Sequence, residues 1–367
     1  MDNAKKETCR ITYNPADKKF DESIRKFQGC PTIAITKGGR IFAGWYSGGD
    51  AEPHIENYNI LVKSDDMGAT WSKPLLVIES SREKMVQCLD IQLWTAPDGR
   101  LFMFWVQNNV LSENDKYEPP RSGQPFVKRD GFVFNDCRHT EWLSICEEPD
   151  ADTLVFSEPK CIDTGFLRCK PLVLKNGRWI NFNYDQLSNY YTYSISDDNG
   201  KTYVRRSGAE KVSTLFDETM AYERDDGSVR MLARTNVGEL AESASYDGGI
   251  TWTPAALSGT DNPDTRFFIS KLPSGRVLMI NNDSRSARRN MSAYLSDDDG
   301  KSWKYKCLID GRGELSYPDA DIYGEKIYLV YDRERQRAAE ILFTSFTEED
   351  ILNGKTDFEI GVISRPR

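Results

Sequence analysis

Three adjacent carboxylates, Asp297 to Asp299, lie in the stretch SDDDGKSW (residues 296–303) and could bind a metal ion or exchange protons. A calcium loop also begins with clustered aspartates, but it needs more oxygen ligands and a bidentate glutamate at its twelfth position. Counted from Asp297, the twelfth residue is Leu308. The stretch is therefore a weak match to a metal site. With only two histidines in the chain, no metal or cofactor is expected.

The same stretch recurs along the chain. The pattern S-x-D-x-G-x-[TS]-[WY] occurs as SDDMGATW, SDDNGKTY, SYDGGITW and SDDDGKSW, and the last three copies start about 50 residues apart, at Ser196, Ser245 and Ser296. Ser and Asp can bond the turn backbone, Gly can adopt a positive φ, and Trp can pack between repeats. Because a scaffold motif repeats whereas an active site occurs once, we interpret these aspartates as structural.

A second marker, a glycine turn that opens a strand, follows the same period. It occurs in KGGRIFAGW, PDGRLFMFW, KNGRWINFN, DDGSVRMLA, PSGRVLMIN and YGEKIYLVY, with glycines at Gly39, Gly99, Gly177, Gly227, Gly275 and Gly324. Six units follow. Within each unit, short runs of alternating and β-branched residues are bounded by Gly, Asp and Asn, which is typical of strands.

These markers predict an all-β fold, a six-bladed β-propeller of four-stranded antiparallel blades. A β-sandwich is the alternative, but it would not explain two regular markers. We expect residues 1–367 to form a single domain, with a polar insertion in the second blade at about residues 107–138. The insertion is read either as a lid over a central pocket or as a surface loop.

The topology of such a blade assigns the turns to two faces. The glycine turns and the Asp motifs must share one face, so the segments before each first strand and the loops after each second strand open on the other. That second face collects many Arg, Glu, Asp, His and Tyr residues, which makes it the expected functional face. They come from the stretch at Gly29, residues 50–57, the insertion at residues 107–138, Asp217, Glu218, Arg234, Arg266, residues 284–290, Ser316 and Tyr317.

The composition of the chain limits the kinds of partner and location that can be expected. The net charge of -9 and the pI near 5.1 argue against nucleic-acid binding. Neither a signal peptide nor a membrane span is recognisable, so the chain is expected to be cytoplasmic as given, or secreted or periplasmic if a leader was removed. Eight cysteines without a CxxC pair suggest reduced core thiols. The oligomeric state is left open.

The repeated S-x-D-x-G-x-T-W resembles the Asp box of the sialidase (neuraminidase) superfamily, whose members are six-bladed propellers. Three segments on the expected functional face are also similar to sialidase segments: FDETMAYERDDGSVRMLART, ARRNMSAYLSDDDG and SYPDADIYGEKIYLVYD. By this resemblance Tyr317 is the nucleophile, Glu218 is its base, and Arg234 and Arg289 bind the substrate's anionic group.

The resemblance is incomplete at the first blade. Sialidases carry a first binding arginine in an Arg-Ile-Pro motif that opens the first strand, and here that place reads Gly29-Cys30-Pro31. Arg25 or Arg266 could substitute for it. The sialidase general acid is an aspartate on the loop after the second strand of the first blade. This chain offers Asp50, Glu52, His54 and Glu56 there; we favour Glu52 and His54 as catalytic and assign Asp50 to substrate binding, and His139 could reach the rim.

The predicted function is an exo-acting glycoside hydrolase with a retaining mechanism, which cleaves a terminal acidic sugar from an oligosaccharide or glycoconjugate. Two alternatives remain. One is a hydrolase or lyase on the same scaffold that acts on a uronic acid or another non-sialic glycan, which the missing arginine favours. The other is a non-catalytic glycan- or protein-binding propeller.

Overall fold

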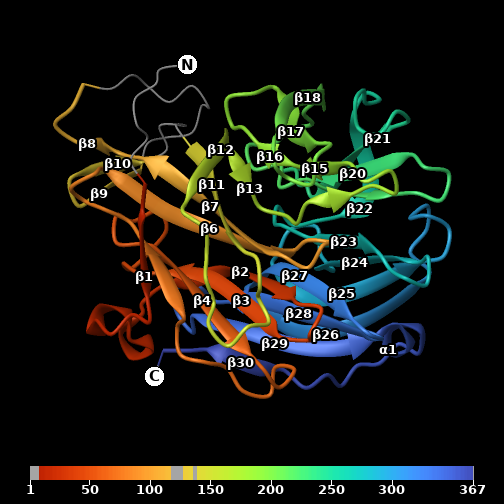
Figure 1. The fold of residues 1–367 in the computed structure, drawn as a ribbon. Coiled ribbons are helices and arrows are strands. Elements are labelled where there is room, and N and C mark those ends of the chain that lie inside the picture. The colour runs from red at the N-terminus through yellow and green to blue at the C-terminus, as the bar shows by residue number, and fades with distance from the viewer. Residues whose placement is uncertain (1–7, 117–126, 135–138, 367) are drawn as a thin grey trace.

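The structure is a computed structural model that describes residues 8–116, 127–134 and 139–366. Within these ranges, six antiparallel sheets of four or five strands follow one another around the molecule in chain order, as the red-to-blue colouring of Figure 1 shows. The predicted all-β, six-bladed propeller is confirmed.

Each blade is built from consecutive strands. The first blade, in hydrogen-bonded order, is β1 (Arg10–Tyr13), β5 (Leu76–Glu79), β4 (Tyr58–Ser64), β3 (Ile41–Ser47) and β2 (Gln28–Ile35). The second is β12 (Lys160–Thr164), β11 (His139–Cys146), β7 (Leu101–Asn109) and β6 (Val86–Thr95). The third is β14 (Leu172–Val173), β15 (Trp179–Asn181), β17 (Tyr190–Ser196) and β18 (Val204–Glu210), with the pair β13 (Phe166–Leu167) and β16 (Asn183–Tyr184) beside it.

The remaining blades follow the same pattern. The fourth is β19 (Met220–Glu223), β20 (Val229–Ala233), β21 (Glu239–Ser245) and β22 (Ala256–Asp261). The fifth is β23 (Phe268–Lys271), β24 (Val277–Asn282), β25 (Arg289–Ser296) and β26 (Tyr305–Gly313). The sixth is β27 (Leu315–Tyr323), β28 (Lys326–Arg333), β29 (Glu340–Thr347) and β30 (Gly361–Ser364).

Two features depart from the regular pattern. The first blade has a fifth strand, because β1 pairs with β5. The expected insertion of the second blade contains a small sheet of β8 (Leu111–Ser112), β10 (Phe132–Phe134) and β9 (Val127–Arg129), and the rest of it lies partly outside the described residues. Helices are short: η1 (Lys18–Phe20), η2 (Glu22–Ile24) and α1 (Glu348–Leu352). Among the described residues, none of these is long and apolar enough to cross a membrane.

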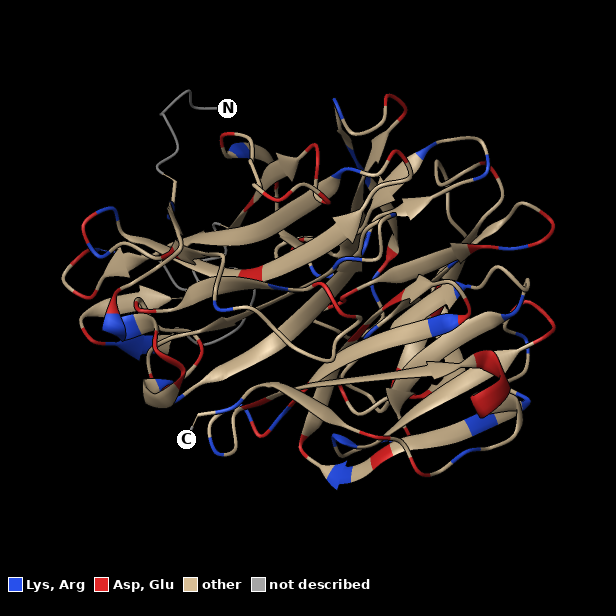
Figure 2. Ribbon diagram, turned by 60° about the horizontal axis from the view of Figure 1, so that its bottom comes forward, with Lys and Arg blue, Asp and Glu red and all other residues tan. Residues whose placement is uncertain are grey.

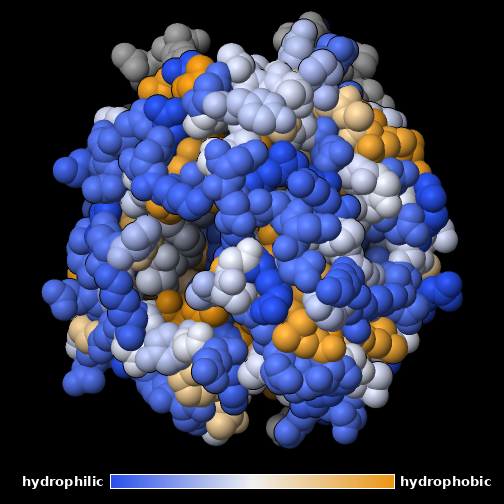
Figure 3. Space-filling model, turned by 90° about the vertical axis from the view of Figure 1, so that its right-hand side faces the viewer, coloured by the Kyte–Doolittle hydropathy of each residue, from blue (hydrophilic) through white to orange (hydrophobic). Residues whose placement is uncertain are grey.

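Burial falls from the centre of the ring toward its rim. All residues of the inner strands β2 and β24 are buried, whereas the outer strand β22 is mostly exposed. Inner strands pack against neighbouring blades on both faces, which explains their nearly continuous apolar runs. Figure 2 shows most charged residues on the loops, and Figure 3 shows one face that is largely hydrophilic, with hydrophobic residues in small groups.

The Asp motifs are self-contained turns. In the fifth blade, Ser296 Oγ donates to Asp298 Oδ1 at 2.7 Å and accepts from the Gly300 amide at 2.8 Å, while Asp298 accepts from both the amide and the hydroxyl of Ser302. The same bonds recur at Ser64, Ser196 and Ser245. The first serine and the central aspartate of each motif are therefore engaged in holding their own turn, as the structural interpretation requires.

Candidate active site

Tyr317, Glu218 and Arg234 form a hydrogen-bonded triangle on the face opposite the Asp motifs. The Tyr317 hydroxyl donates to Glu218 Oε1 at 2.6 Å, and Arg234 Nη1 lies 2.8 Å from Glu218 Oε2 and 3.2 Å from the Tyr317 oxygen. All three side chains are buried. The structure thus brings together three of the residues that the sequence singled out, from the fourth and sixth blades.

These side chains border a cavity of about 280 Å³, here called the Tyr317 cavity. Besides the triangle, its wall contains acidic and basic residues from four blades and from the loop before β25, chiefly Glu52, Asp90, Arg168, Arg288 and Arg335. Among the described residues that line it, four arginines face three carboxylates. The cavity therefore carries a small excess of positive charge, which favours an anionic ligand.

Backbone bulges aim these side chains inward. Pairing slips between Leu89 and Gln92 in β6 and between Ser316 and Asp319 in β27. The residues inside these slips, Asp90 and Tyr317, have φ of 57° and 55°, which non-glycine residues rarely adopt. A bulge bends a strand and redirects one side chain, and such strained backbone gathers at functional sites. Glu218, with φ of 34° just before β19, follows the same pattern.

Charge and burial set the protonation of the pair. Burial opposes ionisation of Glu218, but the charges of Arg234 and Arg168 and the hydrogen bond from Tyr317 outweigh it, so its pKa lies below the ordinary value. Burial and the charge of Glu218 raise the pKa of Tyr317. At neutral pH a neutral phenol therefore donates its hydrogen bond to an ionised carboxylate.

Asp90 and Arg168 form a second buried pair. Arg168 Nη1 lies 2.7 Å from Asp90 Oδ1, and its guanidinium is centred 5.0 Å from the Tyr317 ring. Burial raises the pKa of Asp90 to about 7 despite the opposing charge of Arg168. A carboxyl group with such a pKa holds a proton part of the time near neutral pH, as a general acid must. Neither residue was among the sequence-predicted candidates.

Two predicted binding arginines are corrected. Arg289 is exposed and does not line the cavity; its neighbour Arg288 does, with its guanidinium 5.8 Å from the Tyr317 ring. Consecutive residues at a strand start point to opposite sides, so a shift of one position reverses the direction. Arg266 lies beneath the same ring and is almost fully buried; it donates to the carbonyl oxygens of Arg168 and Pro318. It braces the floor and is not available to a ligand.

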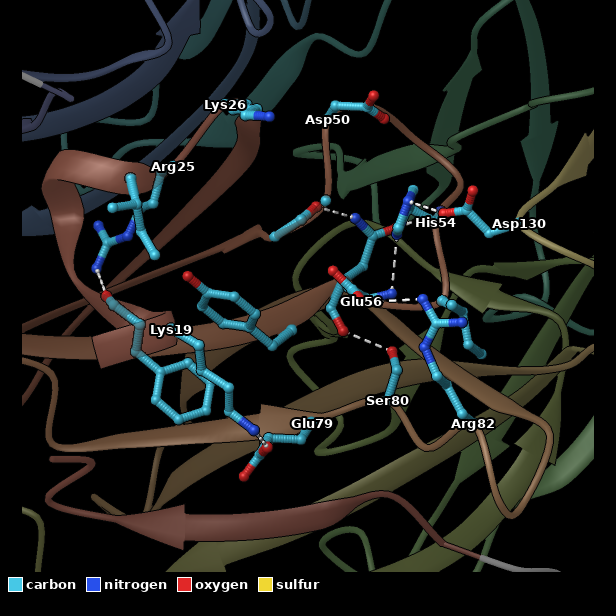
Figure 4. Close-up of a pocket in the computed structure, with 17 residues that line it drawn as sticks. Lys19, Arg25, Lys26, Asp50, His54, Glu56, Glu79, Ser80, Arg82 and Asp130 are labelled. Atoms are coloured by element: carbon cyan, nitrogen blue, oxygen red, sulfur yellow. Dashed lines mark hydrogen bonds and ion pairs between the residues drawn. The ribbon is translucent and has the colours of Figure 1, made fainter. Parts of the chain in front are cut away.

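The loop after β3 divides its residues between two cavities. Glu52 lines the Tyr317 cavity, where its Oε2 lies 3.2 Å from Arg335 Nη1. His54 and Asp50 instead face a second cavity of about 570 Å³, here called the His54 cavity and shown in Figure 4. There His54 Nε2 lies 2.9 Å from Asp130, and its Nδ1 accepts the Glu56 amide at 3.0 Å. The predicted placement of His54 and Asp50 beside the nucleophile is therefore wrong.

The last two sequence-predicted candidates are Arg25 and His139, and they lie at different cavities. Arg25 donates to Ser364 Oγ and to the Phe20 carbonyl, and it lines the His54 cavity. It therefore does not supply the missing first arginine. His139 does line the Tyr317 cavity, with its ring centre 4.0 Å from that of Phe166. Burial lowers the pKa of His139 to about 3, so the imidazole is neutral at physiological pH. Among the described residues, no group of three His, Cys, Asp or Glu side chains is placed to hold a metal ion.

The propeller, its Asp motifs on one face and this charged cavity on the other define a sialidase-like propeller domain. Residues 39–328 match the BNR repeat-like domain family, and the chain belongs to that family. No curated protein matches the sequence. The resemblance to the sialidase superfamily is confirmed by the family match together with the solved structures that share the fold.

Three solved structures illustrate that likeness. The NanB sialidase of Streptococcus pneumoniae is 17% identical with a TM-score of 0.67, over 92% of this chain and 71% of that one. The intramolecular trans-sialidase of Ruminococcus gnavus, solved with oseltamivir carboxylate, is 16% identical with a TM-score of 0.67, over 94% and 98%. The Hadza microbial sialidase Hz136 is 18% identical with a TM-score of 0.68, over 90% and 67%. At these identities the likeness concerns the fold.

Proposed function

We propose that this protein is an exo-acting glycoside hydrolase that removes a terminal acidic sugar with retention of configuration. The observation that carries the proposal is the 2.6 Å hydrogen bond from Tyr317 to Glu218 in a buried cavity bordered by arginines. A cavity of about 280 Å³ lies at the small end of ligand pockets and suits one sugar unit better than an internal stretch of a glycan.

In this mechanism the Tyr317 oxygen attacks the anomeric carbon while its proton passes to Glu218 Oε1. The bond from the anomeric carbon to the leaving oxygen breaks, and a general acid protonates that oxygen. Water then attacks the tyrosyl-linked sugar, gives a proton to the same acid, and Glu218 returns its proton to Tyr317. A neutral tyrosine suits an anomeric carbon that carries a carboxylate, since an aspartate or glutamate nucleophile would be repelled.

Arg234 and Arg288 are proposed to hold the anionic group of the sugar. Both line the cavity, and a planar guanidinium can bind a carboxylate through two parallel hydrogen bonds. Arg234 is also fixed by Asp264, whose Oδ1 lies 2.6 Å from its Nε. Because Asp264 binds Nε, the two Nη atoms of the guanidinium are left to bind Glu218 and a ligand.

Two carboxyl groups are proposed candidates for the general acid, Glu52 at the rim and Asp90 deeper in the wall. Leaving-group chemistry distinguishes them. Loss of a general acid slows substrates with a basic leaving oxygen far more than nitrophenyl glycosides, whose leaving group needs no proton. We expect either Glu52→Gln or Asp90→Asn, but not both, to show this selective loss; equal losses on both substrate types in each variant would contradict both assignments.

The overall proposal is tested with fluorogenic sialosides, uronides, rhamnosides and arabinosides. Turnover of a sialoside that disappears in Tyr317→Phe supports the proposal, and an NMR time course should give the retained anomer first. If no donor is turned over while glycans bind measurably, the chain is a binding propeller and the enzymatic proposal fails.

A second candidate is an enzyme of the same scaffold that acts on a uronic acid or another non-sialic glycan. The specific observation in its favour is Gly29, which stands where the first sialidase arginine would begin the first strand, just before Cys30, which is buried beside Tyr317. Turnover of a uronide without turnover of a sialoside would favour this candidate.

A further inference from the structure

Arg335 reaches the Tyr317 cavity from the far end of the chain. It lies on the loop between β28 and β29, and its guanidinium is centred 4.3 Å from the Tyr317 ring. On the way its side chain crosses β2 at Gly29. A Cβ atom on Gly29 would come within 2.8 Å of both Cδ and Nε of Arg335, a distance too short for non-bonded carbon atoms. The absence of a side chain at position 29 is what lets Arg335 pass.

The backbone conformation at Gly29 does not require a glycine. Its φ lies outside the left-handed region that favours this residue, and it pairs in register with Tyr46 in β3. The close approach of the Arg335 side chain is therefore the reason for a glycine at this position. By the resemblance drawn from the sequence, this is also the place where the first binding arginine of sialidases would stand.

Each nitrogen of the Arg335 guanidinium has a partner, two of them buried and one at the rim of the cavity. Its Nε lies 3.0 Å from Asp332 Oδ2, a fully buried oxygen that also accepts the Cys30 amide at 2.7 Å. Its Nη2 donates to Ser316 Oγ at 3.3 Å. Its Nη1 lies 3.2 Å from Glu52, whose side chain is 35% exposed. A buried partner orients the cation, and only a rim carboxylate would have to share it with a ligand.

Resting on the proposed function, we propose that Arg335 is the third carboxylate-binding arginine of this site and that Gly29 is the residue that admits it. The ligand class is a sugar that carries a planar carboxylate, held by Arg335 together with Arg234 and Arg288. Such a site would be assembled from β28–β29, β20 and the loop before β25, without the arginine of the first strand.

The test uses acid and ester pairs, because a methyl ester keeps the sugar but removes the charge. N-acetylneuraminic acid and glucuronic acid are each titrated by calorimetry against their methyl esters, with wild type, Arg335→Ala, Arg335→Lys and Gly29→Ala. Arg337→Ala is the matched control, since Arg337 lies on the same loop with its side chain 71% exposed. Thermal unfolding of each variant verifies that it is folded.

We expect wild type to prefer at least one acid over its ester by roughly tenfold or more, as loss of a charge-assisted bidentate contact implies. Arg335→Ala should abolish most of that preference, Arg335→Lys should keep part of it, and Gly29→Ala should imitate Arg335→Ala because the new methyl group displaces the arginine. Arg337→Ala should bind as wild type does.

Two outcomes overturn the inference in distinguishable ways. If wild type and Arg335→Ala prefer the acid equally, Arg335 only braces its loop and the proposed function stands. If wild type does not distinguish acid from ester, or binds neither, the anionic-sugar function itself fails, and the role of Arg335 falls with it.

Discussion

The Tyr317 cavity and the His54 cavity are both lined by residues of one loop, residues 50–57, but they differ in volume, in the burial of their charged side chains and in the blades that supply these side chains. The His54 cavity is twice as large, about 570 Å³ against about 280 Å³. Its charged side chains come from the first blade, the segment before β2 and the small sheet of the insertion. Most are already neutralised by neighbours at or near the surface, as the pairs Lys19–Glu79 and Arg82–Glu56 show in Figure 4.

In the smaller cavity most of the charged side chains are buried, and they come from several blades. Tyr317, Glu218 and Arg168 are each less than 9% exposed, and two of them lie on backbone in the left-handed region. Burying such groups is costly unless they are paired, so their convergence needs a reason beyond folding. The comparison teaches that the larger cavity is not the one with the features of a functional site, which are convergent buried charges on strained backbone.

The largest expected difference concerns the chemical step. Tyr317→Phe removes the proposed nucleophile and Glu218→Gln removes its proposed base, so each should lower kcat by about a thousandfold or more. The measurement is steady-state turnover of whichever fluorogenic donor wild type accepts. His54→Gln, made in the larger cavity, is the control. A Tyr317→Phe enzyme that keeps a tenth of its turnover would contradict the tyrosine mechanism.

A large effect on stability is expected at Asp90. Because burial raises its pKa to about 7, the folded state binds more protons than the unfolded one, and stability falls as pH rises from about 4 to about 7. Asp90→Asn keeps the shape without the charge, so it should stabilise the fold at pH 7 by about 3 kcal/mol relative to wild type. Urea unfolding measures the difference, which should vanish near pH 4.

Asp130→Asn, in the His54 cavity, is the control for the effect of Asp90→Asn on the free energy of unfolding. The Asp130 side chain is 54% exposed, and we expect a change in the free energy of unfolding of no more than about 0.5 kcal/mol at pH 7. If Asp90→Asn destabilises the protein at pH 7, the buried pair with Arg168 is worth more than the cost of burying it, and the contrast between the two cavities weakens.

The two histidines offer a smaller effect, since each cavity holds one. Burial lowers the pKa of His139 to about 3. A histidine with a lowered folded pKa contributes stability above its unfolded pKa of about 6.5, and this stability is lost as pH falls toward 3. Between pH 7 and pH 5 wild type should therefore lose about 2 kcal/mol more than His139→Gln does. The free energy of unfolding is measured by chemical denaturation at both pH values. If wild type and His139→Gln lose the same amount between pH 7 and pH 5, the buried His139 accepts a proton in the folded state and the prediction is wrong.

The smallest effect is expected for turnover at His54. His54 is bonded to Asp130 and to the Glu56 amide and faces away from Tyr317, so His54→Gln should change kcat/KM by less than about threefold. The assay is the same fluorogenic turnover. A loss of tenfold or more would join the two cavities into one site and remove the distinction drawn between them.

Much of this could be predicted from the sequence, because the fold repeats. The Asp motifs and glycine turns predicted six blades, and the blade topology selected the face on which Tyr317, Glu218 and Arg234 meet. The small sheet and the fifth strand of the first blade were not foreseen, because neither belongs to the repeat.

Asp90 and Arg168 were missed although the repeat contained a signal for them. In five blades, the residue nine positions before the turn glycine occupies one equivalent place: Cys30, Asp90, Arg168, Glu218 and Arg266 precede Gly39, Gly99, Gly177, Gly227 and Gly275. Arg288 and Arg335 carry no such signal. The direction of the Arg288 side chain depends on the register of β25, and that of Arg335 depends on its passage over Gly29. The local sequence pattern specifies neither.

The consecutive construction of the blades has a consequence for biosynthesis. Among the described residues no sheet combines strands from both ends of the chain. The ring closes instead through side chains, such as the 2.7 Å bond from the Thr32 hydroxyl to Asp319, and through the 3.1 Å bond from the Gln28 amide to the Arg335 carbonyl. β2 and β27 lie side by side at that seam in Figure 1. Since Tyr317 and Arg335 belong to the sixth blade, a ribosome-bound chain of five finished blades lacks both side chains, and the Tyr317 cavity is completed only when the sixth blade docks.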